Sequence, residues 1–444
     1  MKSSLQLVNR ILARKSREEK NPEASWRARA ATRSTVNADL TSFELHPSFV
    51  ELRMLTAAAE RFGIGNPFFK THEGTGGPVT RIDGKEYLNF SHYNYLGLNG
   101  HPEVNKAAME AVERYGTSVG ASRLVAGERP IQRELEKALA DLYGVDDCVV
   151  FVSGHATNVS AISTLFGPKD IIVHDSLIHN SVLEGIRLSG ATRRSFPHND
   201  MHALDELLAA SRGQYERALI VAEGMYSMDG DLPDLPALVD IKQRHGAFLM
   251  LDEAHALGVL GATGRGIAEQ YGLSGKDVDI WMGTLSKTLA GCGGYIAGSR
   301  ALVDILKFAA PGFVYSVGLA PPLAAASLAA LRIMLREPER ARRLRERGAL
   351  FLDQARKAGL NVGSSRGFSV IPVILGSLRK AIALSNQLFA RGINVQPIIH
   401  PAVEEKAARL RFFLSAMHKE NDIRRVCREL AQLLHGKDIS DARE

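Results

Sequence analysis

A lysine surrounded by small residues is the feature of this sequence with the clearest chemical meaning. Lys287 lies in residues 283–295, where glycines and hydroxyl residues precede and follow it. The apolar run at 280–282 predicts a buried strand that ends just before the lysine. A surface lysine does not require such small neighbours, whereas a lysine bonded to a flat, phosphorylated molecule does. The segment therefore predicts a lysine that holds an organic cofactor.

A carboxylate is expected close to this lysine. The apolar run at 247–251 leads directly into Asp252, which precedes Lys287 by 35 positions (287 − 252). That interval accommodates one helical crossover between neighbouring parallel strands. Both side chains would then meet at the carboxyl edge of one sheet, where open α/β sheets bind ligands. A carboxylate facing a pyridine nitrogen keeps the ring protonated as an electron sink, so the pair indicates pyridoxal 5′-phosphate (PLP).

Several groups suit the phosphate of such a cofactor. The apolar run at 148–152 leads into Gly154 and His155 at the start of a predicted helix. Small residues there open the backbone N–H groups of a helix N-terminus toward an anion. A plain strand-to-helix turn would have the same pattern, so this segment alone does not decide. Thr284 and Ser286, beside the lysine, offer hydroxyls to the same phosphate.

Three histidines differ in the chemistry that they suggest. His255 follows Asp252 by three positions and could reach the phenolic oxygen of the ring. His179 could stack on the pyridine face, although a lone histidine is more often structural. His198 has no chemical argument of its own, and we expect it to be structural. Asp252 could simply cap a helix, but its pairing with Lys287 favours a cofactor partner.

Two other patterns are typical of different protein classes. The run Asp252-Glu-Ala-His255 also occurs in nucleic-acid helicases, which require a Gly-x-x-x-x-Gly-Lys-Ser/Thr loop that this sequence lacks. The glycines of residues 258–266 have dinucleotide-like spacing, but they do not open a helix directly after a strand. The sequence therefore favours neither a helicase nor a dinucleotide-binding domain.

Length and composition are typical of a globular protein. The chain has 444 residues, of which 45% are hydrophobic and 23% charged, which suggests two or three domains. Its net charge of +6 is dispersed, so we expect no nucleic-acid partner. No apolar stretch reaches the roughly 20 residues of a membrane span. Cys148, Cys292 and Cys427 are isolated and form no metal-ligand pair, which favours a reduced, cytoplasmic protein without a metal site.

The order of apolar and amphipathic segments predicts an α/β fold. Strands are expected at 148–152, 171–173, 218–222, 247–251, 280–282 and 295–297, alternating with helices. Such alternation predicts a mostly parallel sheet with helices on both faces. Apolar segments at 370–375, 393–397 and 411–414, with a helix at 420–434, predict a smaller α+β domain. The expected division is an arm and linker at 1–45, an N-terminal segment at 46–97, a large domain at 98–335 and a small domain at 336–444.

The first residues have a pattern of their own. An apolar cluster between Leu5 and Leu12 stands beside basic residues between Lys2 and Arg17, as in a short amphipathic helix. Such a helix could dock on a partner or a membrane surface. The simpler interpretation is a frayed helical arm, because one face this short binds weakly. The segment lacks the long apolar core of a secretory signal.

Several longer motifs resemble one enzyme family. They are Asn89-Phe-Ser-His-Tyr-Asn-Tyr-Leu-Gly97, Gly120-Ala-Ser-Arg-Leu-Val-Ala-Gly127, Glu223-Gly-Met-Tyr-Ser-Met-Asp-Gly-Asp231, Asp252-Glu-Ala-His-Ala-Leu-Gly258 and Gly283-Thr-Leu-Ser-Lys287. With these motifs in order, residues 45–435 resemble the α-oxoamine synthases, which are fold-type-I PLP enzymes. That family includes serine palmitoyltransferase and 8-amino-7-oxononanoate synthase. The segments at 154–158 and 177–181 look most like serine-palmitoyltransferase-type and polyketide-associated members.

The resemblance implies roles for the cofactor residues. Lys287 would bond to PLP and act as acid and base at the substrate α-carbon. His179 would stack on the ring, while Asp252 and His255 would contact the ring nitrogen and phenolic oxygen. Ser227 falls near the ring edge, and Thr284 matches a phosphate ligand.

The resemblance also implies substrate contacts, with some departures. Arg411 matches the arginine that binds the amino acid carboxylate, a task suited to a bidentate guanidinium. Asn94 resembles a substrate-side polar contact. His155 stands where many members carry Phe or Tyr, and Gln132 where a histidine is common. Ser316 is the candidate for a hydroxyl that reaches the phosphate site of a second subunit.

The implied activity is the decarboxylative condensation of an amino acid with an acyl thioester, giving an α-amino ketone. The acyl donor would be acyl-CoA or an acyl-carrier protein, and the enzyme would be a homodimer with shared active sites. One alternative is an 8-amino-7-oxononanoate synthase-type step; another is aminotransferase or decarboxylase chemistry on the same scaffold. A cofactor-free structural or regulatory subunit is a third possibility, which the presence of Lys287, Asp252 and His255 disfavours.

Overall fold

The computed structural model describes residues 38–61 and 65–436, which belong to two units divided after Asn66. The described part of the first unit contains two short 3₁₀ helices, η1 (Ala38–Thr41) and η2 (Phe43–Leu45), and helix α3 (Pro47–Arg61). The amphipathic segment expected near residues 5–12 lies outside the described residues. The second unit begins at Pro67 and contains the candidate active site.

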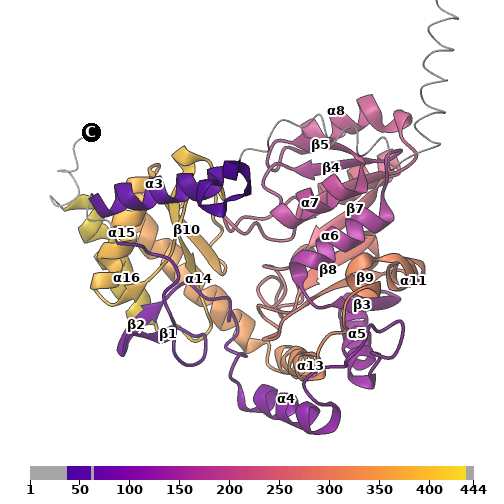
Figure 1. Cartoon of the computed structure of the whole chain (residues 1–444), viewed down its shortest axis with the longest axis horizontal. Helices are drawn as coiled ribbons and strands as arrows, with labels where there is room; N and C mark the ends of the chain where they lie inside the picture. The colour runs from indigo at the N-terminus through magenta and orange to yellow at the C-terminus, as the bar shows by residue number, and fades with distance from the viewer. Residues whose placement is uncertain (1–37, 62–64, 437–444) are drawn as a thin grey trace, which may run out of the picture. The chain divides into compact units, whose positions relative to one another are not determined.

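The largest sheet of the second unit has seven strands and is called the central sheet below; most of its strands are labelled in the right-hand part of Figure 1. Its strands occur in the order β3-β9-β8-β7-β6-β4-β5. Every neighbouring pair is parallel except those of β9, which runs antiparallel to β3 and β8. The predicted α/β fold with a mostly parallel sheet is therefore confirmed. The strand bounds are β3 (Asp147–Phe151), β4 (Ile171–Asp175), β5 (Thr192–Phe196), β6 (Ala218–Glu223), β7 (Phe248–Asp252), β8 (Ile280–Thr284) and β9 (Gly294–Gly298).

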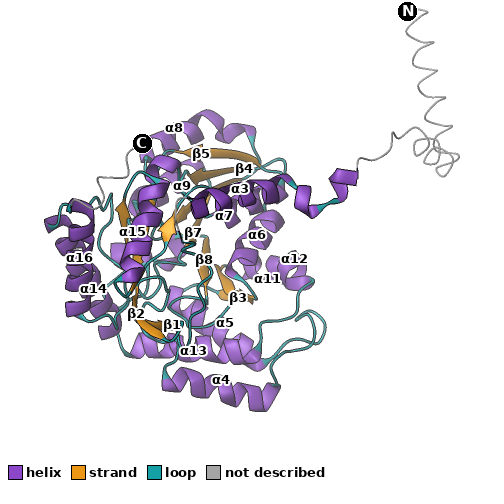
Figure 2. Ribbon diagram, turned by 60° about the vertical axis from the view of Figure 1, so that its left-hand side comes forward, coloured by secondary structure: helices purple, strands orange, loops and turns teal. Residues whose placement is uncertain are grey.

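Helices cover both faces of this sheet (Figure 2). Side chains of a strand alternate between faces, so Met250 of β7 packs in one apolar cluster and Leu249 and Leu251 pack in the other. Helices α6 (Gly154–Leu165), α7 (Asn180–Ser189) and α11 (Arg300–Ala309) cover the Met250 face. The opposite face is covered by α5 (Pro130–Tyr143), α8 (Met201–Ser211), α9 (Leu235–His245) and α13 (Pro321–Arg336).

Two three-stranded sheets lie outside the central one. The first joins β1 (Val79–Ile82), β2 (Lys85–Asn89) and β11 (Ile393–Asn394), so residues from both ends of the unit share a sheet. The second has the order β10 (Val370–Ile374), β13 (Arg409–Phe413) and β12 (Pro397–Ile398). Helices α14 (Glu339–Lys357), α15 (Leu378–Ala390) and α16 (Glu420–His435) lie beside this second sheet: α14 contacts β10, α15 contacts β12 and β13, and α16 contacts both helices. The domain boundaries expected from the sequence remain a prediction.

A proline separates two of the long helices. Helix α13 ends at Arg336 and α14 begins at Glu339, because Pro338 between them has no N–H to continue the helix. Across residues 38–61 and 65–436, no helix combines the length and apolar character needed to span a membrane. The remaining elements are α4 (Pro102–Tyr115), α10 (Ile267–Tyr271), α12 (Pro311–Val314), η3 (Arg212–Gln214), η4 (Gly275–Asp277) and η5 (Glu405–Ala407).

Candidate active site

Lys287 and Asp252 line one cavity at the carboxyl edge of the central sheet. Asp252 is the last residue of β7 and pairs in register with Met282 of the neighbouring parallel strand β8. Lys287 follows the end of β8 by three residues. The cavity has a volume of about 230 Å³. Its lining consists of Ser153, Gly154, His155, Asn158, His179, Ser181, Glu223, Ser227, Asp252, Ala254, His255, Met282, Thr284, Ser286 and Lys287.

The lysine is placed in an environment that favours its neutral amine. Burial lowers the pKa of Lys287 to about 8, although the charge of Asp252 opposes this shift. Its Nζ lies 5.3 Å from the centre of the Tyr93 ring. Because only the neutral amine is a nucleophile, a lowered pKa makes this side chain more reactive in neutral solution.

The Asp252 carboxylate is oriented from helix α6. Its Oδ2 accepts a hydrogen bond from Asn158 Nδ2 at 3.0 Å, and its Oδ1 accepts one from the backbone N–H of Ala254 at 3.0 Å. Asn158 Nδ2 also donates to Ser181 Oγ at 2.9 Å. Ser181 Oγ lies 2.7 Å from His179 Nδ1. One chain of hydrogen bonds thus joins the carboxylate to the histidine.

His179 lines the cavity and is exposed to solvent. It caps helix α7, where its Nδ1 accepts from the backbone N–H of Ser181 at 3.3 Å. Desolvation by the surrounding protein lowers the pKa of His179, although the charge of Asp252 opposes the shift. A neutral, planar ring in this place is suited to stack on a flat cofactor.

His255 is buried beside the same cavity. Its Nδ1 lies 2.7 Å from the hydroxyl of Tyr95, which fixes the orientation of the ring. Burial lowers the pKa of His255 well below its usual value, and the charge of Lys287 acts in the same direction. The imidazole is therefore neutral, and its other nitrogen is the one available to a ligand.

The phosphate-binding groups expected from the sequence also line the cavity. Gly154 begins helix α6, whose N-terminus presents backbone N–H groups. A Cβ at Gly154 would lie 3.0 Å from Thr284 Oγ1, so the backbone and this hydroxyl are already in close approach. Thr284 Oγ1 in turn donates to Ser286 Oγ at 3.2 Å. This set of donors fits an anionic phosphate.

The residues predicted to bind substrate lie outside the cavity lining. Arg411 of β13 donates from Nη1 to the Ser227 carbonyl at 2.9 Å, and its guanidinium carbon lies 4.6 Å from the centre of the Phe413 ring. The Asn94 amide nitrogen donates to two backbone carbonyls, at 2.9 and 3.2 Å. Ser316 lies outside the lining as well. Their predicted contacts with substrate or a second subunit remain predictions.

Comparison with known proteins identifies the family. The aminotransferase class I and II family matches residues 85–430. An 8-amino-7-oxononanoate synthase of Geobacter sulfurreducens is 42% identical over 372 residues, which cover 83% of this chain and 94% of that protein. One from Symbiobacterium thermophilum is 40% identical over 346 residues, covering 78% and 88%. The chain belongs to the α-oxoamine synthase family of PLP-dependent enzymes.

Solved structures agree with this assignment. Serine palmitoyltransferase from S. paucimobilis superposes with a TM-score of 0.84 at 28% identity, covering 88% of this chain and 98% of that one. An 8-amino-7-oxononanoate synthase from Francisella tularensis gives a TM-score of 0.69 at 25% identity, covering 79% and 98%. The resemblance and the fold type I expected from the sequence motifs are thereby confirmed.

Three residues of the candidate site in this α-oxoamine synthase were not singled out from the sequence. Asn158 and Tyr95 orient Asp252 and His255, respectively. Glu223 ends β6 beside Asp252 and lines the cavity. Burial and the charge of Asp252 raise the pKa of Glu223 to about 8, which favours its protonated form in neutral solution. All three lie within motifs quoted in the sequence analysis, but nothing in the sequence indicated their partners.

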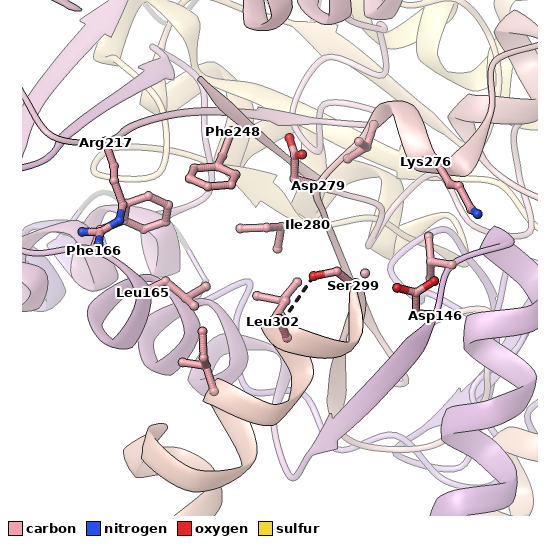
Figure 3. Close-up of a pocket in the computed structure, with 15 residues that line it drawn as sticks. Asp146, Leu165, Phe166, Arg217, Phe248, Lys276, Asp279, Ile280, Ser299 and Leu302 are labelled. Carbon is pink, nitrogen blue, oxygen red and sulfur yellow. Dashed lines mark hydrogen bonds between the residues drawn. The ribbon is translucent and has the colours of Figure 1, made fainter. Parts of the chain in front are cut away.

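A larger cavity of about 490 Å³ lies at the opposite edge of the sheet. Figure 3 shows Phe248, Ile280 and Leu302 around it, with Arg217 and Lys276 at its two ends. Phe248 and Ile280 are the first residues of their strands, so this is the amino edge. None of the residues that line it belongs to the Lys287 site, and the cavity is therefore separate from it.

Proposed function

We propose that this enzyme condenses an amino acid with an acyl thioester, with loss of CO₂, to give an α-amino ketone. The observation that carries the proposal is the convergence of Lys287, Asp252, His179 and His255 on one cavity in a chain of this family. PLP, when bound there, supplies an electron-withdrawing ring that stabilises negative charge at the amino acid α-carbon. Side chains of the protein would hold the cofactor, bind the amino acid and move its α-proton.

Some polar groups of the cavity would contact the phosphate of PLP and others its ring. The N-terminus of α6 with Thr284 and Ser286 would bind the phosphate, and Lys287 would bond to the aldehyde carbon. Asp252 would hold a proton on the ring nitrogen, because a carboxylate favours the positive form of its partner. His255 would donate a hydrogen bond to the phenolic oxygen. His179 would stack on the ring face, with Ser227 at the ring edge.

With the cofactor and the amino acid bound, the Lys287 amine would be the base that takes the α-proton. Its lowered pKa of about 8 suits this task, because a catalytic base works best with a pKa near the working pH. Arg411 would bind the substrate carboxylate through guanidinium N–H groups other than the one that it donates to the Ser227 carbonyl. Asn94 is the further substrate contact proposed from the family motif.

Serine-palmitoyltransferase-type and 8-amino-7-oxononanoate synthase-type reactions are the two candidate forms of this chemistry. The first is supported by the solved structures at a TM-score of 0.84, and the second by relatives at up to 42% identity. The acyl donor is acyl-CoA or an acyl-carrier protein. We also propose a cytoplasmic homodimer, in which Ser316 reaches the phosphate site of the second subunit.

Replacement of the lysine tests the proposal. Lys287→Ala should lose turnover by at least about 10³-fold, because it removes both the bond to the cofactor and the acid–base group. The same variant should still bind PLP without a covalent bond, which equilibrium dialysis measures. Lys276→Ala, at the separate cavity, is the matched control and should keep full activity. Normal steady-state turnover by Lys287→Ala would refute the mechanism.

A further inference from the structure

His198 lies between two buried carboxylates at the carboxyl edge of the sheet. It occupies the loop between β5 and α8. Its Nδ1 lies 3.0 Å from Asp175 Oδ1, and its Nε2 lies 2.9 Å from Asp231 Oδ2. A neutral imidazole has one N–H and can donate to only one of them. With an acceptor at each nitrogen, the imidazolium is the form that satisfies both contacts.

The charge balance around His198 favours the same form. Burial acts against the charged ring, but the hydrogen bonds and charges of Asp175 and Asp231 outweigh it and raise the pKa of His198 to about 10. The ring also meets the Tyr226 ring edge-on, with centres 4.4 Å apart. Asp175 and Asp231, with the Tyr226 phenol, are the titratable groups in contact with it.

The Asp175 side of this bridge leads to His179. Asp175 is the last residue of β4, and its Oδ1 accepts from the backbone N–H of Leu177 at 2.8 Å. Its carbonyl accepts from the N–H of Ile178 at 3.2 Å. These bonds shape the short turn that ends at His179, the cap of α7. A shift of the Asp175 carboxylate would therefore move the ring that faces the cofactor.

The Asp231 side leads to Ser227 and Arg411. The Asp231 carbonyl accepts from the N–H of Tyr226 at 3.0 Å, which closes the loop that contains Ser227. The Ser227 side chain lines the cavity, and its carbonyl accepts from Arg411 at 2.9 Å. Ser364 Oγ also donates to Asp231 Oδ2, at 3.0 Å. This loop therefore carries Ser227, which lines the cavity. Through the Ser227 carbonyl it also positions Arg411, the candidate carboxylate-binding residue of β13.

We propose that His198 is a positioning residue, a cation that fixes the turn carrying His179 relative to the loop carrying Ser227. This inference rests on the proposed function, because it concerns the same site. His198 does not line the cavity, so it acts on the site through the groups that it contacts, chiefly the carboxylates of Asp175 and Asp231. His198 would therefore position two parts of the site together: His179, which would stack on the cofactor ring, and the Ser227 loop with Arg411, which would bind the amino acid.

His198→Gln removes the cation and leaves a neutral side chain of similar length. We expect the variant to fold and bind PLP, with the visible circular dichroism of the cofactor reduced and the dissociation constant of the amino acid raised about tenfold. The KM of the acyl thioester should stay within about twofold. His202→Gln, at an exposed histidine of α8, is the matched control and should match the wild type.

Asp231→Asn provides a second variant, in case His198→Gln does not fold. It removes one charge and should show the same two changes in circular dichroism and amino acid affinity. Wild-type values of both quantities in the folded variants, even with a lower melting temperature, would overturn the inference and leave His198 purely structural. A failure of the proposed function would give a different result from a failure of this inference. In that case the wild-type enzyme itself would not release thiol from an acyl thioester.

Discussion

Asn158 Nδ2 lies 3.0 Å from Asp252 Oδ2 and thereby ties helix α6 to the end of strand β7. The same nitrogen donates to Ser181, which contacts His179. One buried amide therefore orients the carboxylate that would face the edge of the cofactor ring and the histidine that would face its plane. Neither side chain could adjust independently of the other.

Asn158→Ala should weaken catalysis without removing the cofactor. A hydrogen bond to a charged group contributes about 1.5–3 kcal/mol, so we expect kcat/KM to fall roughly 10- to 100-fold. Steady-state kinetics with saturating PLP measure this change. Asn105→Ala, on the exposed surface of α4, is the control and should keep wild-type kinetics. Unchanged kcat/KM in Asn158→Ala would show that Asp252 needs no such support.

The pKa of Lys287 predicts how cofactor attachment depends on pH. Because the neutral amine is the reactive form and the pKa is about 8, the rate at which the apoenzyme bonds to PLP should rise as pH increases through 8 and then level off. Stopped-flow absorbance at a series of pH values follows this reaction. A rate that climbs only toward pH 10.5, the ordinary lysine value, would show that burial does not lower this pKa.

Arg411→Lys should impair binding of the amino acid selectively. A lysine keeps the positive charge but cannot form a bidentate pair with a carboxylate. We expect the KM of the amino acid to rise roughly tenfold, while the KM of the acyl thioester changes little. Arg193→Lys, on the exposed part of β5, is the matched control. An equal rise in both KM values would argue against carboxylate binding by Arg411.

The contribution of His198 to stability should decrease in alkaline solution. Its pKa of about 10 in the folded protein exceeds the ordinary 6.5, so its stabilising effect is complete below pH 6.5 and is lost as pH rises through 10. The melting-temperature difference between wild type and His198→Gln should therefore be largest near pH 6 and shrink toward pH 10. Differential scanning calorimetry measures it, and a difference that does not vary with pH would contradict the assignment.

The central strands could be predicted because they are buried on both faces. Strands β3, β4, β6, β7 and β8 appear in the sequence as short apolar runs, and Asp252 and Lys287 follow two of them. Strand β5 was not predicted. It lies at the edge of the sheet and exposes Arg193, Arg194 and Ser195, so its sequence has no apolar run.

The supporting contacts could not be predicted because they join residues far apart in the chain. Asn158 and Asp252 are separated by 94 positions, and Tyr95 and His255 by 160. No local pattern encodes such a pair, which depends on how α6 and the loops pack on the finished sheet. His198 was expected to be structural for the same reason, since neither Asp175 nor Asp231 is its neighbour in sequence. Arg411 was found only through resemblance to the family.

The balance of products tests the central claim most directly. The wild-type holoenzyme would be mixed with an amino acid labelled at its carboxyl carbon and with an acyl thioester, for a panel of amino acids including glycine, alanine and serine. The proposed condensation predicts that labelled CO₂ and free thiol appear in equal amounts for the preferred amino acid, and that Lys287→Ala releases neither. Formation of a keto acid or loss of CO₂ without release of thiol would contradict it and favour aminotransferase or decarboxylase chemistry.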